Sequence, residues 1–450
     1  MALIELDLAA PPDHPPSSIP PVHRYRTTGL VLAVVLVFVL GGGAAPGPLR
    51  WRYLGAIPLA TVAESPFQVG DDDRVYTAGG QGADRTVSAW TLAKPPVRLW
   101  TVPVPARPVV PNQVTYGDVR PQRAGDVVLI NDGPQTTAVD ARTGAPRWQA
   151  GIGVDPLPGG RIGLVRDPKF RPHTEYDQDS GAPGELFFSA TGVPHDEAPI
   201  ETDLRGIDLR TGATIWSAEA AGSVVVLEAD GVLVLESNRL TLRSTETGAV
   251  LRTTVLPRLH GLAPESGSLV GDLVLVSYGS GDSDARTLVG YSVRTFRRLW
   301  QVPEAKVLTN PSLCLDLVCA DDKSGVSVLD PATGRRLWQL AGLDLVRAGA
   351  DVFEQASGTT NPVRMADPRN GDERLSLSGW HNDVTTTGDG PVLLRRTDDS
   401  GASAFAAVDD NPVGLKSLGA THGPVSDCAA NGRFVVCRGA GALQVFAYRG

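Results

Sequence analysis

The sequence has little lysine and no long run of one charge. Only five of its 41 basic residues are lysine, and no block of like charge exceeds Asp71-Asp72-Asp73, which is typical of a solvated turn. The formal net charge is −9. Because a basic patch is needed to attract phosphate backbones, this composition argues against nucleic-acid binding.

Patterns typical of helices are also missing after residue 51. The 50 glycines and 36 prolines make up about 19% of the chain, between the average of about 12% and the roughly 25–30% of low-complexity sequences. Residues of these two types at this frequency break helices and here show no three-residue period, which excludes coiled coils, helical bundles and collagen. Since 42% of the residues are hydrophobic, the chain can still build a core.

Cysteine is scarce and occurs as two close pairs, Cys314/Cys319 and Cys428/Cys437. No cysteine precedes Cys314, which excludes a lipoprotein anchor. An even count in close pairs fits disulfides in an oxidising compartment, whereas the spacings and the lack of nearby histidine exclude zinc sites. We predict that each pair closes a cross-strand disulfide within one hairpin, and Asn431-Gly432 is a tight-turn signal for the second.

One apolar stretch lies near the N-terminus. Residues 27–49 carry no charge, and with glycine and alanine counted they reach the roughly 20 residues that cross a bilayer. Arg24 and Arg26 flank the start, which favours a cytoplasmic N-terminus. We therefore expect a disordered cytoplasmic tail (1–26), a single transmembrane helix (27–49) and an extracytoplasmic domain (50–450). The alternative is a signal peptide cleaved near residues 42–45.

The remainder reads as short strands. Runs such as Val127–Ile130, Val232–Leu235 and Leu273–Val276 are rich in β-branched and aliphatic residues and are bounded by Gly, Asp, Asn or Thr. No amphipathic helical window competes with them, so the expected fold class is all-β.

The turns between these runs follow a repeated pattern, A-x-D-x-x-T-G-x-x-x-W. The clearest copies contain Asp140, Thr143, Gly144 and Trp148; Asp208, Thr211, Gly212 and Trp216; and Asp330, Thr333, Gly334 and Trp338. Degenerate copies end at Trp100 and Trp300, and one has Phe296 at the glycine position. Another has Arg252 where Trp is expected, so we expect a weaker joint there.

The copies begin at residues 90, 138, 206, 242, 290, 328, 365 and 407. Successive copies begin 36–48 residues apart, except for one interval of 68. A period of this size with several strands per unit indicates a β-propeller of four-stranded blades. Asp and Thr are suited to bonding the turn backbone, Gly to a left-handed conformation, and Trp to packing on the next blade.

These residues resemble the pyrroloquinoline-quinone-like (PQQ-like) β-propeller repeat, as in proteins similar to outer-membrane assembly factor B, here of the membrane-anchored type found in actinobacteria. In that family the repeated segment is the tryptophan-docking motif. The resemblance implies a propeller over most of residues 51–449, but the same repeat serves both enzymes and scaffolds.

The two ends of the domain are expected to share a blade. The last repeat lacks a Trp strand, and residues 51–58, beginning with Trp51, look like the missing one. Joining them would close the ring and remove exposed strand edges. Strict counting predicts nine blades, but we expect eight, the commoner number in the resembling family, with one degenerate unit absorbed.

Candidate chemistry is sparse, and we predict no catalytic, cofactor or metal residue. The resembling quinone enzymes use calcium ligands and often an adjacent cysteine pair, and neither is identifiable here. Asp177 and Asp179 only begin a calcium-loop pattern and read as a solvated turn, and His195 reads as an exposed loop residue. No G-x-S-x-G or GxxxxGK[ST] motif occurs.

The interval of 68 residues between two copies indicates an insertion in 155–205, either a tolerated loop or a partner-binding one. The expected function is a non-catalytic scaffold or receptor for a protein or cell-envelope ligand. The alternative is an enzyme or sensor that binds a quinone or small ligand at the central mouth.

Overall fold

The computed structural model describes residues 51–59, 66–80, 84–104, 119–177, 179, 181, 186–222, 224–229, 231–279, 286–303, 306–307, 318–322, 325–340, 343–348, 351–356, 358–387, 390–410, 413–421 and 423–449. The predicted tail (1–26) and transmembrane helix (27–49) lie outside these residues. Within the described ranges, no helix is long and apolar enough to span a bilayer.

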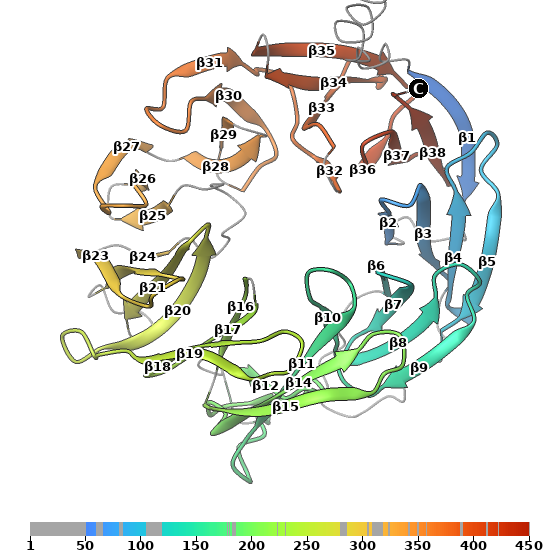
Figure 1. The fold of residues 1–450 in the computed structure, drawn as a ribbon. Helices are drawn as coiled ribbons and strands as arrows, with labels where there is room; N and C mark the ends of the chain where they lie inside the picture. The colour runs from blue at the N-terminus through green and yellow to red at the C-terminus, as the bar shows by residue number, and fades with distance from the viewer. Residues whose placement is uncertain are drawn as a thin grey trace, which may run out of the picture. The chain divides into compact units, whose positions relative to one another are not determined.

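Residues 49–450 form one compact unit, and its sheets follow one another around a ring (Figure 1). The first three blades contain β2 (Phe67–Val69), β3 (Arg74–Gly79), β4 (Thr86–Thr91) and β5 (Arg98–Pro103); β6 (Arg120–Ala124), β7 (Val127–Asp132), β8 (Gln135–Asp140) and β9 (Pro146–Ala150); and β10 (Asp155–Pro156), β11 (Ile162–Lys169), β14 (Glu201–Asp208) and β15 (Thr214–Ala221). The small hairpin β12 (Phe187–Phe188) and β13 (Pro194–His195) lies between β11 and β14 in the chain.

The next three blades contain β16 (Val225–Ala229), β17 (Gly231–Glu236), β18 (Arg239–Arg243) and β19 (Val250–Val255); β20 (Ala263–Val270), β21 (Leu273–Gly279), β22 (Thr287–Ser292) and β23 (Arg298–Pro303); and β24 (Lys306–Val307), β25 (Val318–Asp322), β26 (Gly325–Leu329) and β27 (Arg336–Leu340). The last three contain β28 (Leu343–Ala348), β29 (Asp351–Ala356), β30 (Pro362–Ala366) and β31 (Glu373–Ser376); β33 (Leu393–Thr397), β34 (Ser403–Asp410) and β35 (Val413–Ala420); and β36 (Ser426–Ala430), β37 (Phe434–Arg438), β38 (Ala442–Ala447) and β1 (Arg52–Pro58).

The described strands thus confirm an all-β propeller and give it nine blades. The expectation that one degenerate unit would be absorbed, leaving eight, is wrong. The weak copies still form hairpins, for example β30–β31 and β34–β35, because backbone hydrogen bonding between strands does not require the motif side chains.

The ring closes through both ends of the domain. Strand β1 pairs antiparallel with β38, with Arg52 opposite Ala447 and Pro58 opposite Ala442. The predicted closure of the last blade by residues 51–58 is confirmed.

The eighth blade departs from four strands. Its sheet contains β33, β34 and β35, whereas β32 (Val384–Thr386) pairs in parallel with β36 of the ninth blade, with Val384 opposite Cys428. Between β31 of the seventh blade and β33 of the eighth, the chain therefore runs along the inner edge of the ninth blade.

Buried aliphatic residues form the core at the joints between blades. One cluster combines Tyr76 and Val87 of the first blade with Val128 and Ile130 of the second. Because both faces of each sheet are covered by neighbouring blades, the middle strands are almost continuously apolar, as in β21, where every residue is buried.

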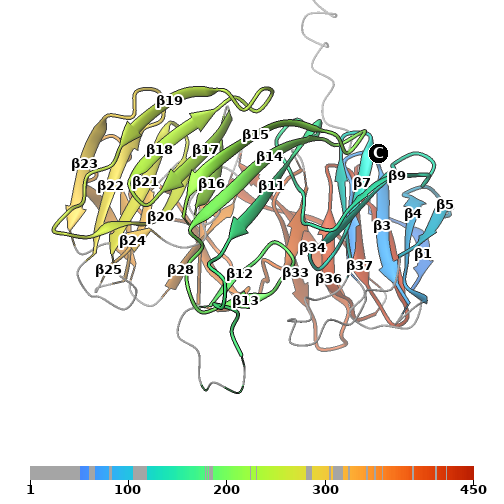
Figure 2. The same cartoon turned by 90° about the horizontal axis from the view of Figure 1, so that it is seen from below.

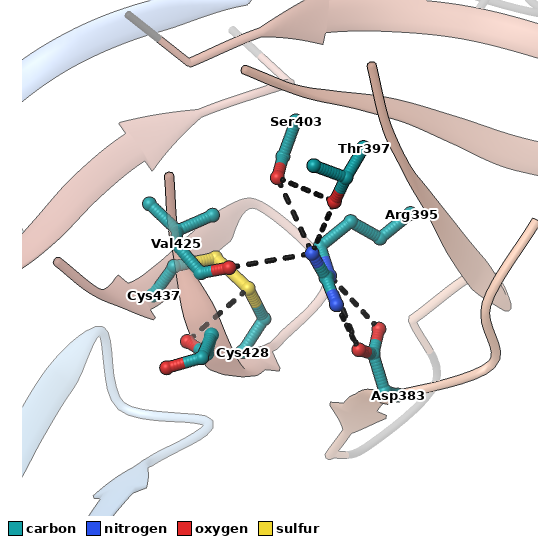
Figure 3. A network of polar contacts seen from close by, with 8 residues as sticks. Asp383, Arg395, Thr397, Ser403, Val425, Cys428 and Cys437 are labelled. Atoms are coloured by element: carbon teal, nitrogen blue, oxygen red, sulfur yellow. Dashed lines mark hydrogen bonds and ion pairs between the residues drawn. A yellow bond between two sulfur atoms is a disulfide. The ribbon is translucent and has the colours of Figure 1, made fainter. Parts of the chain in front are cut away.

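Polar contacts reinforce the joint between the eighth and ninth blades (Figure 3). The guanidinium of Arg395 in β33 pairs with both carboxylate oxygens of Asp383 and donates to the Thr397 hydroxyl at 2.8 Å and the Val425 carbonyl at 3.3 Å. Asp383 precedes β32 and Val425 precedes β36, so one side chain joins three segments.

The disulfide Cys428–Cys437 lies beside this network and joins opposed residues of β36 and β37. The cross-strand pairing predicted for these two cysteines is confirmed. Cys319 is buried in β25, but Cys314 lies outside the described residues, so their pairing stays a prediction.

Candidate functional site

The repeated turn residues form the same local hydrogen-bond pattern wherever the motif is complete. The Asp140 carboxylate accepts bonds of 2.8 Å from both the amide and the hydroxyl of Thr143, and the Gly144 amide donates to the Asp140 carbonyl at 2.8 Å. Gly144 has φ +73°, a conformation that favours glycine. Hydrogen bonds from Arg147 and Thr143 hold the pKa of Asp140 well below its usual range.

The other complete copies repeat this geometry. Asp208 accepts from the Thr211 amide at 2.9 Å, and Asp330 accepts from the Thr333 amide at 3.0 Å. The glycines that follow, Gly212 and Gly334, have φ +73° and +68°.

Each motif tryptophan lies on the glycine of the next blade's turn. A Cβ built on that glycine would be 2.6–2.8 Å from the ring, and the contacting pairs are Trp100–Gly144, Trp148–Gly212, Trp216–Gly248, Trp300–Gly334 and Trp338–Gly371. The indole N–H donates to a carbonyl in the same turn, at 3.1 Å to Ala141, 2.7 Å to Leu209, 2.7 Å to Thr245, 2.8 Å to Pro331 and 2.8 Å to Pro368. In each turn the acceptor directly follows the Asp position of the motif, or the Ser that replaces it.

Trp51 does not lie on the turn of the next blade as the motif tryptophans do. Its indole donates to the Ala420 carbonyl at 3.0 Å and contacts Gly419, so it faces back onto the eighth blade. Leu54, which is buried, occupies the third position of β1, the position that Trp100 holds in β5.

The joint between the fourth and fifth blades uses a different pair of residues. Arg252 stands in place of the tryptophan, and its guanidinium donates to the Val293 carbonyl at 2.8 Å, where an indole would. Phe296 stands in place of the glycine at φ +56°, and its ring centroid is 5.4 Å from the Arg252 guanidinium carbon. At this joint the aromatic ring therefore comes from the following blade, the fifth, whereas at the joints with a motif tryptophan it comes from the preceding blade.

The insertion is shorter than predicted. Strands β11 and β14 pair from Ile162–Asp208 to Lys169–Glu201, so much of 155–205 belongs to the third blade. Between β11 and β14, the described residues 170–177, 179, 181 and 186–200 depart from the repeat, and Figure 2 shows their hairpin β12–β13 near one end of β11 and β14.

Two side-chain predictions in the insertion have different outcomes. Asp177 and Asp179 are exposed, and the Asp179 amide donates to the Asp177 carboxylate at 3.0 Å, as expected of a solvated turn. His195 is buried, which corrects the expected exposed loop residue. Its ring stacks on Phe170 with centroids 3.7 Å apart, and its Nδ1 is 3.0 Å from the Thr174 hydroxyl.

The same hairpin borders two adjoining cavities. The larger has a volume of about 300 Å³ and is lined by residues that include Arg166, Phe170, Phe187, Phe188 and Pro199. The second, about 250 Å³, reaches Gly133 and Pro134 of the second blade and includes Asp155. Arg166, Ser189 and Ala190 line both.

One acidic cluster lies nearby. Carboxylate oxygens of Glu201, Asp203 and Glu219 lie within 4.8 Å of one another, and over the described ranges this is the one group with three possible metal ligands. The Lys169 ammonium lies 3.5 Å from Asp203 and 2.6 Å from Asp167, and its pKa is raised chiefly by the hydrogen bond to Asp167. This lysine offsets part of the negative charge at Asp203.

Comparison with known proteins agrees with this architecture. Residues 201–387 match the family model of the outer membrane protein assembly factor BamB. This region consists of PQQ-like β-propeller repeats. The resemblance inferred from the turn pattern is thereby confirmed. No curated protein matches the chain.

Several solved structures resemble this propeller at low identity. BamB from Moraxella catarrhalis is 16% identical over 88% of this chain and 100% of its own, with a TM-score of 0.39. A eukaryotic initiation factor is 13% identical over 76% and 89%, with a TM-score of 0.47. Sqt1 from Saccharomyces cerevisiae is 12% identical over 90% and 100%, with a TM-score of 0.42. The fold assignment follows from the sheet order and the family match.

Proposed function

We propose that this chain is a non-catalytic propeller that acts as a protein-interaction scaffold on the outer side of a cell membrane. The observation that supports this proposal best is that the described residues of the insertion between β11 and β14 present exposed apolar side chains beside a cavity. Phe188 is 39% exposed and Ile200 is 51% exposed. Loops that project from a rigid ring commonly bind partners.

The absence of catalysis is supported by the polar groups of the described residues. Two buried carboxylates, Asp132 and Glu354, are each held by two hydrogen bonds from an arginine, Arg85 and Arg364. The other two buried carboxylates of the described residues also pair with arginines, Glu236 with Arg239 and Asp351 with Arg374. The motif carboxylates bond their own turns. The family match to BamB, named as an assembly factor, agrees with a role in protein assembly.

The location is supported by two features. A buried disulfide fits an oxidising compartment, and the apolar segment 27–49 would supply the membrane helix. A β-lactamase reporter fused after residue 450 and expressed in a bacterial host tests this part. We expect ampicillin resistance, and a stable fusion that leaves the cells sensitive would refute the outer location.

Proximity labelling from the same end of the full chain, in its native host, tests the scaffold role. We expect labelled envelope proteins that a membrane-anchored control of unrelated fold does not label; identical labelling would contradict the proposal.

The non-catalytic assignment is tested by adding calcium and pyrroloquinoline quinone to the purified protein. Reduction of a dye would overturn this assignment.

A further inference from the structure

The two cavities beside β12–β13, here together called the groove, share Arg166, Ser189 and Ala190 and have mixed walls. Phe170, Phe187, Pro168 and Pro199 supply apolar surface to the larger cavity, and Phe188 lies at its edge with 39% exposure. Both cavities have Arg166 in their lining, so a ligand in either one can reach its guanidinium.

The aromatic wall is held in place before any ligand binds. Phe170 stacks on His195, which is buried and bonded to Thr174, and β13 pairs Pro194 with Phe188. A wall that is already ordered loses little conformational freedom on binding, which favours affinity.

Arg166 is the one charged side chain among the described residues that line the larger cavity. It pairs with Asp155 at 2.7 Å, but the two side chains are 48% and 58% exposed. Ion pairs this exposed contribute little to stability, so a ligand carboxylate can replace Asp155. The neighbouring cations Lys169, Arg171 and Arg205 have partners at Asp167, Glu197 and Asp167.

The volume limits what can occupy the site. A cavity of about 300 Å³ is at the lower end for small-molecule sites, which suits one large side chain better than a cofactor. The second cavity shares Arg166 with the first and reaches Pro134, so a ligand longer than one side chain has further surface to contact.

We propose that this groove binds an extended internal segment of a partner protein that carries an aromatic residue beside an aspartate or glutamate. The aromatic side chain enters the cavity lined by Phe170 and Phe187, and the carboxylate pairs with Arg166. This inference rests on the scaffold function proposed above and adds the chemistry of the partner.

The test uses the full chain and a panel of fluorescein-labelled, C-terminally amidated hexapeptides. Each peptide has Trp or Phe adjacent to Asp or Glu, or one residue apart, in a Gly/Ser background. We expect at least one to raise the anisotropy saturably and competitively, with at least a tenfold loss of affinity when its acid becomes the amide or its aromatic residue becomes Ala. No saturable binding up to 1 mM by any peptide would overturn the proposal.

Variants locate the site. Arg166→Gln should abolish the preference for acid over amide, and Phe188→Ser should weaken binding at least tenfold. Leu251→Ser, at an exposed position in β19, is the matched control and should bind like the native chain. Equal effects of Phe188→Ser and Leu251→Ser would place binding elsewhere and refute the groove. Both variants are surface changes, and unchanged far-UV circular dichroism checks their fold.

Two further arms separate competing outcomes. A peptide whose only carboxylate is its free C-terminus tests whether the groove binds a chain end instead of an internal segment. If that peptide binds more tightly than the amidated peptides with Asp or Glu, the internal-segment proposal is overturned. If Phe188→Ser leaves proximity labelling of partners unchanged, the groove proposal fails while the scaffold function stands.

Discussion

Replacing Gly212 by alanine should destabilise the joint between the second and third blades through one contact. A Cβ at Gly212 would lie 2.6 Å from Cγ of Trp148, whereas ordinary contacts begin at 3.4 Å. Gly212 also has φ +73°, so alanine there carries backbone strain as well. Gly358 has the same φ but no atom within 4 Å of its Cβ position, which makes Gly358→Ala a matched control.

The two substitutions share the backbone cost and differ in the clash. A left-handed conformation costs a non-glycine residue about 1–2 kcal/mol. Overpacking a well-filled contact costs about 1–3 kcal/mol more. We therefore expect the free energy of unfolding to fall by about 1–2 kcal/mol for Gly358→Ala and about 2–5 kcal/mol for Gly212→Ala.

Urea unfolding followed by far-UV circular dichroism measures both values, and a double-mutant cycle isolates the contact. In a Trp148→Ala background the clash is gone, so Gly212→Ala should cost no more than Gly358→Ala. The coupling free energy between Gly212 and Trp148 should be about 1–3 kcal/mol. Equal destabilisation by both glycine changes, or a coupling near zero, would refute the role assigned to this joint.

Three further predictions concern other joints and the turns. Arg252→Trp or Phe296→Gly alone should each lower the free energy of unfolding by about 1–3 kcal/mol. The double variant restores the Trp/Gly arrangement of the other joints and should recover most of the loss. Additive losses in urea unfolding would argue against the idea that Arg252 and Phe296 together replace the Trp/Gly pair. Cys428→Ala with Cys437→Ala should cost about 2 kcal/mol, because the closed loop is short, and a loss above 4 kcal/mol in the same assay would contradict this reasoning. The depressed pKa of Asp140 contributes stability above the unfolded pKa of about 3.9, and this contribution is lost as the pH falls below that value. The stability difference between the native chain and Asp140→Asn should therefore shrink between pH 5 and pH 2, and a constant difference would be inconsistent.

The repeat allowed much of the fold to be predicted because its residues act locally. Asp140, Thr143 and Gly144 bond within one turn, so their spacing alone locates a hairpin. The blade number depended on copies such as Ala407–Ser417, which lack these residues. The pairing of β34 with β35, which includes Ala407 opposite Lys416, shows that this copy forms a hairpin.

The candidate groove could not be predicted, since its parts are distant in the chain. His195 sits in a polar sequence, His195-Asp196-Glu197, but its ring is buried and stacks on Phe170, 25 positions earlier. Arg166 lines the cavities together with Pro134 of the preceding blade and with residues of the β12–β13 hairpin. The sequence indicated only that the long interval was an insertion.

Closure of the ring by β1 and β38 also has a consequence for the order of events during synthesis. Strand β1 leaves the ribosome first, but its partner begins at Ala442, 384 positions after Pro58. At roughly 5–20 residues per second, β1 has no partner strand for about 20–80 s. For that time it presents an unpaired edge, which invites association with other chains. A nascent chain that stops before β38 cannot close the ring, even if all of its other blades have formed.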